Sequence, residues 1–182
     1  MTLKHHPHTP THLFLDDTLY FVTGAIYQKR SLLAYFELKK RLLELIQEYF
    51  QTYNWDLHQW VILHNHYHLL GQSYEGKDLT NIFRSIHSRA GILISQSTHC
   101  GKPIWWNYWD YCPRDEAEYM IRLNYLLTNP IKHGYVTNLH DYPFSSFHNL
   151  FAEIGRERLA QQMRDYPDYK HLVLREAKND DF

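Results

Sequence analysis

The sequence lacks the features that mark membrane, secreted and disulfide-bonded proteins. Its 182 residues contain no apolar run of the ~18 residues that a membrane span requires. The first residues, MTLKHHPHTPTHLF, have no apolar core of the length that a secretory signal needs. The two cysteines, Cys100 and Cys112, give neither a disulfide framework nor a CxxC metal pair. We therefore expect a cytoplasmic protein.

The sequence also lacks an excess of charge, an internal repeat and a long Gly/Ser linker. Nineteen Lys and Arg residues against twenty Asp and Glu residues leave a net charge of −1. This balance argues against a uniformly basic nucleic-acid binder but allows a local basic patch. With 44% hydrophobic and 16% aromatic residues, the chain is typical of a globular domain. We expect an N-terminal arm at 1–18, one main domain at 19–154 and a C-terminal extension at 155–182.

Histidine, in contrast, is abundant, with 14 residues. Four of them lie in the Pro-containing arm, where a mobile segment and a metal-capturing segment are both open interpretations: His5, His6, His8 and His12.

Hydrophobic periodicity predicts alternating strands and helices. LYFVTGAIY (19–27) has the β-branched and aromatic composition of a buried strand. Helical spacing of apolar residues follows from Tyr35 to Tyr49. WDLHQWVIL and HYHLLGQS, separated by His64 and Asn65, predict a hairpin in which Asn65 tolerates a positive φ.

The second half of the domain continues this alternation. Asp78 is expected to cap a helix that ends at Gly101, and PIWWNYWDY (103–111) predicts a fourth strand. A further helix opens at Asp115 and is expected to end at Thr128 or Asn129, because Pro130 follows. The resulting order predicts an α+β fold of the ferredoxin-like, split βαβ type, with a central antiparallel sheet and an additional helix. The strand His66–Gln72 would lie near the middle of that sheet.

The stretch HNHYH (64–68) contains the strongest candidate for chemistry. Residues two apart on a strand point to the same face, so either His66 and His68 or His64 and His66 project together. We favour His66 with His68, because Asn65 suits the turn whereas Tyr67 can pack inward. Two neutral imidazoles can hold a divalent cation. One His-x-His pair is expected by chance among so many histidines, so the pair alone leaves a structural interpretation open.

NYLLTNPIKHG (124–134) supplies complementary groups. Tyr125 and Asn129 are four residues apart and therefore share one face of a helix. The Asn129 carbonyl oxygen is able to complete a metal shell, and the Tyr125 phenol is able to attack phosphorus. Taken alone, Tyr125 is better explained as a packing aromatic, one of fifteen tyrosines.

Together, His66-Tyr67-His68 within NHYHLL, NYLLTNPIKHG and DYPFSSFHNLF resemble the single-tyrosine HUH transposases, and within them the REP-associated tyrosine transposases. The resemblance covers about residues 19–151. It implies that His66, His68 and Asn129 are metal ligands and that Tyr125 is the nucleophile. Two positions depart from the family pattern: Tyr67 stands where a small aliphatic residue is usual, and His64 where Pro is frequent.

This resemblance implies a metal-dependent enzyme that cuts and rejoins single-stranded DNA beside hairpin or palindromic elements. Tyr125 would form a 5′-phosphotyrosine and release a 3′-hydroxyl, with Mg²⁺ or Mn²⁺ as the expected metal. A replication initiator or relaxase-type nickase and a domesticated, non-catalytic DNA-binding domain are the alternatives. Homodimer and monomer both remain open.

Basic, polar and aromatic side chains are candidate DNA contacts, through phosphates or by stacking on unpaired bases. The structural alternative is that the cations are solvated and the tryptophans belong to the core. The candidates are Lys29, Arg30, Arg84, Ser88, Arg89, Trp105, Trp109, Lys132 and His133.

Overall fold

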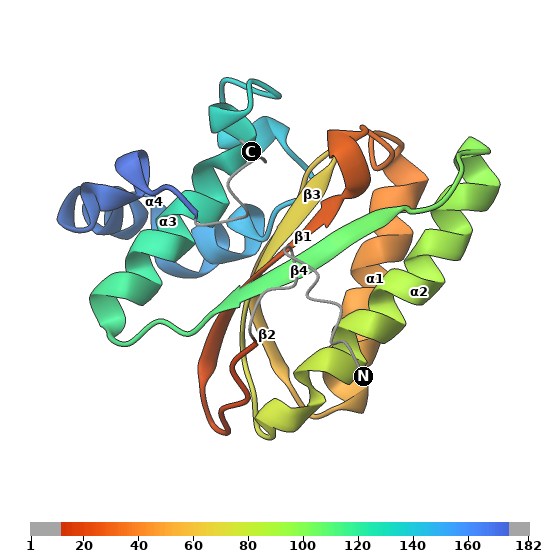
Figure 1. The fold of residues 1–182 in the computed structure, drawn as a ribbon. Coiled ribbons are helices and arrows are strands. Elements are labelled where there is room, and N and C mark those ends of the chain that lie inside the picture. Colours follow the sequence, from red (N-terminus) through yellow and green to blue (C-terminus); the bar gives the residue numbers. More distant parts are fainter. Residues whose placement is uncertain (1–11, 175–182) are drawn as a thin grey trace.

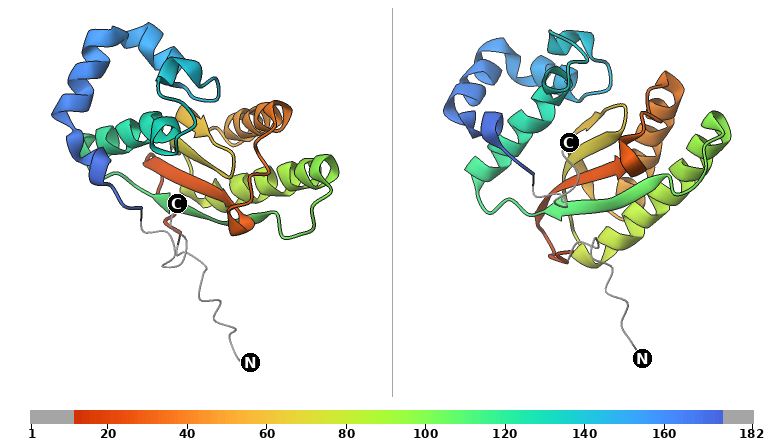
Figure 2. Two further views of the ribbon diagram at one scale, coloured as in Figure 1. Left: turned by 90° about the horizontal axis from the view of Figure 1, so that it is seen from above. Right: turned by 45° about the horizontal axis from the view of Figure 1, so that its top comes forward.

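The computed structural model describes residues 12–174, which form a four-stranded antiparallel sheet with helices on both faces (Figures 1 and 2). The strands lie in the order β2-β3-β1-β4. Helices α1 and α2 cover one face, and α3 and α4 lie on the other. Between 12 and 174, none of the helices combines the length and apolar character needed to cross a bilayer. The bounds are β1 Leu19–Ile26, α1 Phe36–Thr52, β2 Asp56–Ile62, β3 His66–Gln72, α2 Leu79–Thr98, β4 Trp105–Tyr111, α3 Glu116–Lys132 and α4 Phe147–Asp165.

The predicted α+β fold and the order of its elements are confirmed. The strand His66–Gln72 has the predicted bounds and pairs with β1 on one side and β2 on the other. Its first six residues are buried, because helices cover both faces of the sheet at this point. The core on the α1/α2 face is rich in aromatic contacts, such as Phe83 with Phe50 and Tyr108.

The β2–β3 hairpin differs from the prediction at its turn. Three residues, Leu63 to Asn65, separate the strands, and Asn65 is absent from the positive-φ residues of the described chain. Its backbone oxygen instead accepts a hydrogen bond from the Ile26 amide at 2.7 Å, and its side-chain amide donates to the Lys29 oxygen at 3.3 Å. Asn65 therefore ties the hairpin to the end of β1.

The ends of two helices also differ from the prediction. Asp78 makes no side-chain cap to α2, which ends at Thr98 because His99 adopts a left-handed conformation before Gly101 is reached. Helix α3 continues through Pro130 to Lys132, so the predicted break at this proline is wrong. Because Pro130 lies in the last turn, the missing amide removes little of the helix hydrogen-bond ladder. Lys132 is thereby held on the helix that carries Tyr125.

The chain ends were predicted as separate segments, and their described parts pack against the domain. His12 contacts Asp110 through Nδ1 at 2.5 Å and stacks on Tyr108, whereas His5, His6 and His8 lie outside the described residues. Helix α4 was not predicted; it runs across the expected boundary at 154/155 and is kinked at Gly155, whose φ is 77°. The division into arm, domain and extension stays a prediction.

Tyr67 explains how β3 accommodates a large residue between the two histidines. Its ring lies on the α1/α2 face, is fully buried, and crosses Gly24, its pairing partner on β1. A Cβ on Gly24 would lie 2.3 Å from the Tyr67 ring. The phenol also hydrogen-bonds His87 Nε2 on α2 at 2.8 Å. The missing side chain at Gly24 therefore makes room for Tyr67.

We expect Gly24→Ala to destabilise the protein by about 1–3 kcal/mol, because the added methyl group collides with a fixed ring. Urea unfolding measures the change. Gly101→Ala is the matched control and should be neutral, since a Cβ there meets nothing within 4 Å. In a Tyr67→Leu background the Gly24→Ala cost should shrink; an equal cost in both backgrounds would show that the ring is not responsible.

Candidate active site

His66 and His68 lie side by side on the face of β3 that α3 covers. Their side chains are buried, and their ring centroids are 4.9 Å apart. The register places Ala25 opposite His66 and Thr23 opposite His68, so both rings stand on the central part of the sheet. Strand alternation therefore brings these two imidazoles together, as the sequence predicted; His64 lies outside the strand and contacts Tyr135.

The Nδ1 atom of each imidazole is held by a neighbouring oxygen. His66 Nδ1 lies 2.7 Å from Asn65 Oδ1, which is an acceptor, so Nδ1 carries the proton. The Asn65 amide is oriented by its bond to Lys29. His68 Nδ1 lies 2.8 Å from the Thr23 hydroxyl. Such contacts fix ring orientation and direct the other nitrogen, Nε2, toward the opposite side of the site.

Burial keeps both imidazoles neutral. The pKa of His66 is lowered to about 3, mainly by desolvation, with smaller contributions from the charges of His133, Lys132 and Lys29. Desolvation also lowers the pKa of His68 well below its ordinary value of 6.5. Neutral imidazoles are the form that binds metal ions.

Helix α3 brings Tyr125 and Asn129 to the same place. The Tyr125 ring lies 5.4 Å from the His68 ring, centroid to centroid. Asn129 donates through Nδ2 to the Tyr125 backbone oxygen at 3.4 Å, which turns its Oδ1 toward His66 Nε2, also 3.4 Å away. All four side chains are buried, at 3% exposure or less. Two elements far apart in the sequence therefore converge on one point.

The donor set fits a divalent cation. Nε2 of His66 lies 3.4 Å from Oδ1 of Asn129, and His68 Nε2 is buried with no hydrogen-bond partner. A cation bound between them could take all three atoms as ligands. Residues 12–174 contain no group of three or more His, Cys, Asp and Glu side chains suited to a metal, so an ion at this point would need a ligand of another residue type. The Asn129 amide oxygen could supply it.

Lys132 lies against the phenol. It donates through Nζ to the Tyr125 hydroxyl oxygen at 3.3 Å, and its ammonium is 4.5 Å from the ring centroid. A positive charge at this distance stabilises negative charge on the phenolic oxygen. The sequence predicted Lys132 as a DNA contact, and the structure places it beside the candidate nucleophile.

Only some of the other candidate DNA contacts lie near this site. The charge of Lys29 acts on His66, and the His133 ring is 5.0 Å from the His66 ring, with its Nε2 buried and unbonded. Arg30 instead binds backbone oxygens of Tyr27, Gly101 and Pro103. Arg84, Ser88 and Arg89 belong to α2 on the opposite face of the sheet, where Arg89 pairs with Glu48.

The two candidate tryptophans of β4 lie on opposite faces of the sheet. Trp105 stacks on His87 of α2 at 4.3 Å, whereas Trp109 lines a cavity together with Thr23. The β1–β4 register shifts between Gly24 and Ile26, and this irregularity turns the two indoles to opposite faces. Residues four apart on a regular strand share a face, so strand alternation alone predicts the relative orientation of Trp105 and Trp109 wrongly.

Thr23 and Asn65 are part of the site, and the sequence analysis gave neither residue a role beside the histidines. Asn65 is adjacent to His66 and carries a polar side chain, which was a usable signal. The contact of Thr23 depends on the register between β1 and β3, which no local pattern encodes.

The chain is similar to known transposases in sequence and in fold. A family profile described as "Transposase IS200 like" matches residues 19–112, just over half of the chain. This span contains His66 and His68 and ends before α3. A "REP-associated tyrosine transposase" from Escherichia coli (strain K12) is 35% identical over 100 residues, which cover 53% of this chain and 57% of that relative. The chain thus matches little more than half of that relative's length.

A solved structure shares the fold. It is a REP-associated tyrosine transposase bound to a REP hairpin, with a TM-score of 0.65 and 24% identity. The superposition covers 78% of this chain and 83% of that one.

We expect the metal-free protein to lose stability as the pH falls below about 6.5. The cause is a difference in proton binding: unfolded histidines bind protons near their ordinary pKa of 6.5, whereas burial holds the pKa of His66 and His87 at about 3 and that of His68 far below 6.5. Each should cost about 1.4 kcal/mol per pH unit between 6.5 and its folded value.

Urea unfolding in chelator at pH 7, 6 and 5 measures this slope. His87→Gln should reduce the slope of the unfolding free energy against pH by the contribution of one histidine, about 1.4 kcal/mol per pH unit. His99→Asn, which changes an exposed histidine, should leave the slope unchanged. A stability that is flat from pH 7 to 5 would rule out neutral burial of these rings.

Proposed function

Because the chain belongs to the family of IS200-like transposases, we propose that it is a metal-dependent transesterase acting on single-stranded DNA beside a hairpin or palindromic element. The observation that carries the proposal is the convergence of Tyr125 and Asn129 of α3 on His66 and His68 of β3. We infer that Tyr125 is the nucleophile and that the cytoplasm is the compartment of action. All four groups come from one chain, so a monomer has the complete set.

In the proposed step, the Tyr125 hydroxyl oxygen attacks the phosphorus of a phosphodiester. A bond forms between this oxygen and phosphorus, and the bond from phosphorus to the 3′ oxygen breaks. The phenolic proton leaves, and the departing oxygen gains a proton and becomes a 3′-hydroxyl. The phosphate stays esterified as a 5′-phosphotyrosine, so the reverse attack by a 3′-hydroxyl rejoins DNA without nucleotide hydrolysis.

Lys132 supports this attack by its position. An ordinary phenol titrates near pH 10, so attack at neutral pH needs local positive charge or a base. The Lys132 ammonium is 3.3 Å from the Tyr125 hydroxyl oxygen and stabilises the charge that develops there. The positive field that Lys29 and Lys132 create at His66 would also attract a DNA phosphate.

His66, His68 and Asn129 would hold the metal ion. When bound, a divalent cation polarises a non-bridging phosphate oxygen and orients the scissile group. Mg²⁺ or Mn²⁺ is the expected ion, and two imidazoles also suit Zn²⁺. Asn65 and Thr23 orient the two rings through their Nδ1 atoms.

Hairpin DNA is the proposed substrate, supported by the structural neighbour that was solved with a REP hairpin. Incubation of the protein with hairpin DNA carrying a single-stranded flank, in Mn²⁺, should give a covalent adduct on a denaturing gel. Tyr125→Phe should abolish the adduct, because the nucleophilic oxygen is gone. An adduct that persists in Tyr125→Phe would refute this nucleophile.

His66→Ala separates chemistry from binding in the same experiment. It should lose cleavage and keep much of its DNA affinity, since phosphate contacts elsewhere supply most of the binding energy. Nicking without rejoining would favour the relaxase-type activity. A wild-type protein that binds hairpin DNA but never forms an adduct would favour a non-catalytic binding domain.

Lys132→Met should slow adduct formation at pH 7 by roughly 100-fold, the lower end of the effect of losing one charge-stabilising donor. Because hydroxide deprotonates part of the phenol at high pH, the difference from wild type should narrow toward pH 9. Lys132→Arg should restore part of the rate. Single-turnover kinetics measure the rate of adduct formation. A ratio of wild-type to Lys132→Met rates that stays constant between pH 7 and 9 would argue that Lys132 does not act on the phenol.

A further inference from the structure

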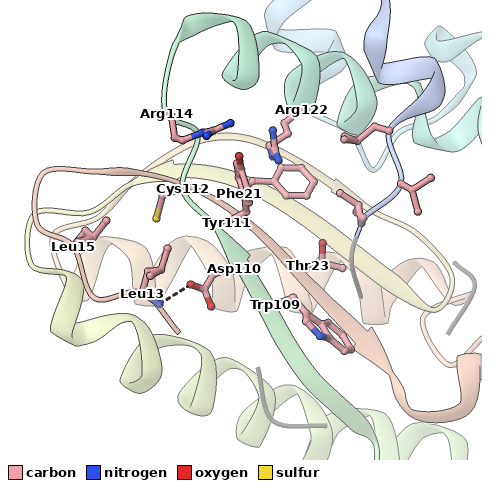
Figure 3. A pocket seen from close by; sticks show the side chains of 13 residues that line it. Leu13, Leu15, Phe21, Thr23, Trp109, Asp110, Tyr111, Cys112, Arg114 and Arg122 are labelled. Carbon is pink, nitrogen blue, oxygen red and sulfur yellow. Dashed lines mark hydrogen bonds between the residues drawn. The ribbon is translucent and has the colours of Figure 1, made fainter. Parts of the chain in front are cut away.

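A cavity of about 1040 Å³ adjoins the candidate active site on the α3 face of the sheet (Figure 3). Small-molecule sites span about 300–1,000 Å³, so the space is ample for a nucleotide. Phe21 and Thr23 line it and also contact the site: the Thr23 hydroxyl bonds His68, and the Phe21 ring lies 6.3 Å from the Tyr125 ring. Leu172–Leu174, after the last helix, form part of the wall. The cavity and the site therefore share a wall.

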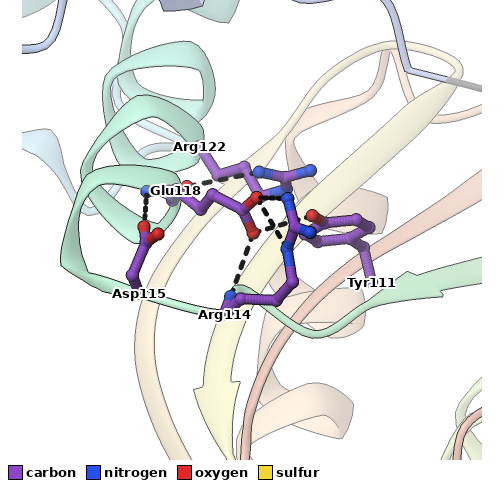
Figure 4. A network of polar contacts seen from close by, with 5 residues as sticks. All are labelled: Tyr111, Arg114, Asp115, Glu118 and Arg122. Atoms are coloured by element: carbon purple, nitrogen blue, oxygen red, sulfur yellow. Dashed lines mark hydrogen bonds and ion pairs between the residues drawn. The ribbon is translucent and has the colours of Figure 1, made fainter.

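Arg122 of α3 is the unusual group in this cavity. The residue is 9% exposed, and its guanidinium carbon lies 3.4 Å from the centroid of the Tyr111 ring (Figure 4). Within residues 12–174, it forms no ion pair with a carboxylate, and its Nε is buried without a hydrogen-bond partner. Nη1 donates to the Glu118 backbone oxygen at 3.3 Å. The charge of Glu118 acts favourably on Arg122 without a direct ion pair between the two side chains. A largely buried cation that lacks a direct anionic partner is costly unless a ligand supplies one.

The carboxylate of Glu118 already accepts hydrogen bonds from other groups. Glu118 accepts hydrogen bonds from the Arg114 side chain and backbone and from the Tyr111 hydroxyl, and these contacts lower its pKa to about 2. Arg122 therefore lines the cavity (Figure 3) and forms no direct ion pair with the Glu118 carboxylate (Figure 4).

The position of Trp109 and the spacing of Arg122 and Tyr125 on α3 favour a nucleotide as the ligand. Trp109 lines the same cavity and offers an indole, the kind of surface on which unpaired bases stack. Arg122 and Tyr125 are three residues apart on α3, which places their Cβ atoms about 5–6 Å from each other. An anion at Arg122 would therefore lie beside a phosphate at Tyr125.

We propose that this cavity binds the nucleotide adjacent to the scissile phosphate, with Arg122 on its backbone phosphate and Trp109 against its base. The proposal rests on the proposed function, because it places the single strand at Tyr125. It makes the cavity a subsite that helps to set which phosphate reaches the phenol.

The test measures binding of hairpin DNA with a single-stranded flank by fluorescence anisotropy, in a Tyr125→Phe background that prevents cleavage. Arg122→Met should weaken binding about 10- to 100-fold, the equivalent of one hydrogen-bonded charge. Arg41→Met, which removes an exposed arginine of α1 on the opposite face, should change it little. The melting temperature of Arg122→Met should change little, because removal of a largely buried charge offsets the loss of its contacts with the Tyr111 ring and the Glu118 backbone oxygen.

Trp109→Leu and an abasic scan of the flank locate the nucleotide. Trp109→Leu should weaken binding about tenfold with intact DNA and have no effect when the abasic site is at one position next to the scissile phosphate. Full affinity of Arg122→Met, or a Trp109→Leu effect at every abasic position, would overturn the proposal.

The two proposals fail separately. If wild type forms the adduct and Arg122→Met binds normally, the subsite is rejected and the transesterase stands. If no adduct forms but Arg122→Met and Trp109→Leu show these losses, the subsite stands and the transesterase is rejected.

Discussion

The pairing register of β3 with β1 is the constraint on which the candidate site depends. In the observed register, Thr23 faces His68 and Gly24 faces Tyr67, so the imidazoles point to α3 and the phenol of Tyr67 points to α2. A slip of one residue would exchange these faces and bury the imidazoles against α2. Gly24 opposes such a slip, because the ring of Tyr67 fits only where a side chain is missing. The packing of Tyr67 over Gly24 on one face thus fixes the orientation of His66 and His68 on the other face.

Helix α3 supplies the second half of the site as one rigid element. Arg122, Tyr125, Asn129 and Lys132 follow one another at helical spacing. The proposed anion contact, nucleophile, metal ligand and neighbouring cation therefore keep fixed relative positions. The helix maintains this arrangement through Pro130, which falls close enough to its end to be tolerated. Asn129 links the two halves, since it binds the Tyr125 backbone with one atom and faces His66 with the other.

The order of elements, the central place of β3 and the pairing of His66 with His68 could be predicted because periodicity and alternation are local properties. Asn129 and Tyr125 could be placed on one helical face for the same reason. The separation of Trp105 from Trp109 could not, because it arises from an irregularity between β1 and β4. The position of Arg84 and Arg89 on the opposite face, and the part played by Thr23, likewise depend on tertiary packing. Asn65 was predicted for its backbone conformation, and its side-chain contacts are what matter in the structure.

The close fit of Tyr67 over Gly24 bears on the order in which these residues could have been acquired. A tyrosine introduced while position 24 carried a side chain would have met a steric barrier. A glycine introduced first would have left a small void and a modest loss of stability. An order with glycine at position 24 before tyrosine at position 67 avoids that barrier, and with both in place each residue restricts the substitutions open to the other.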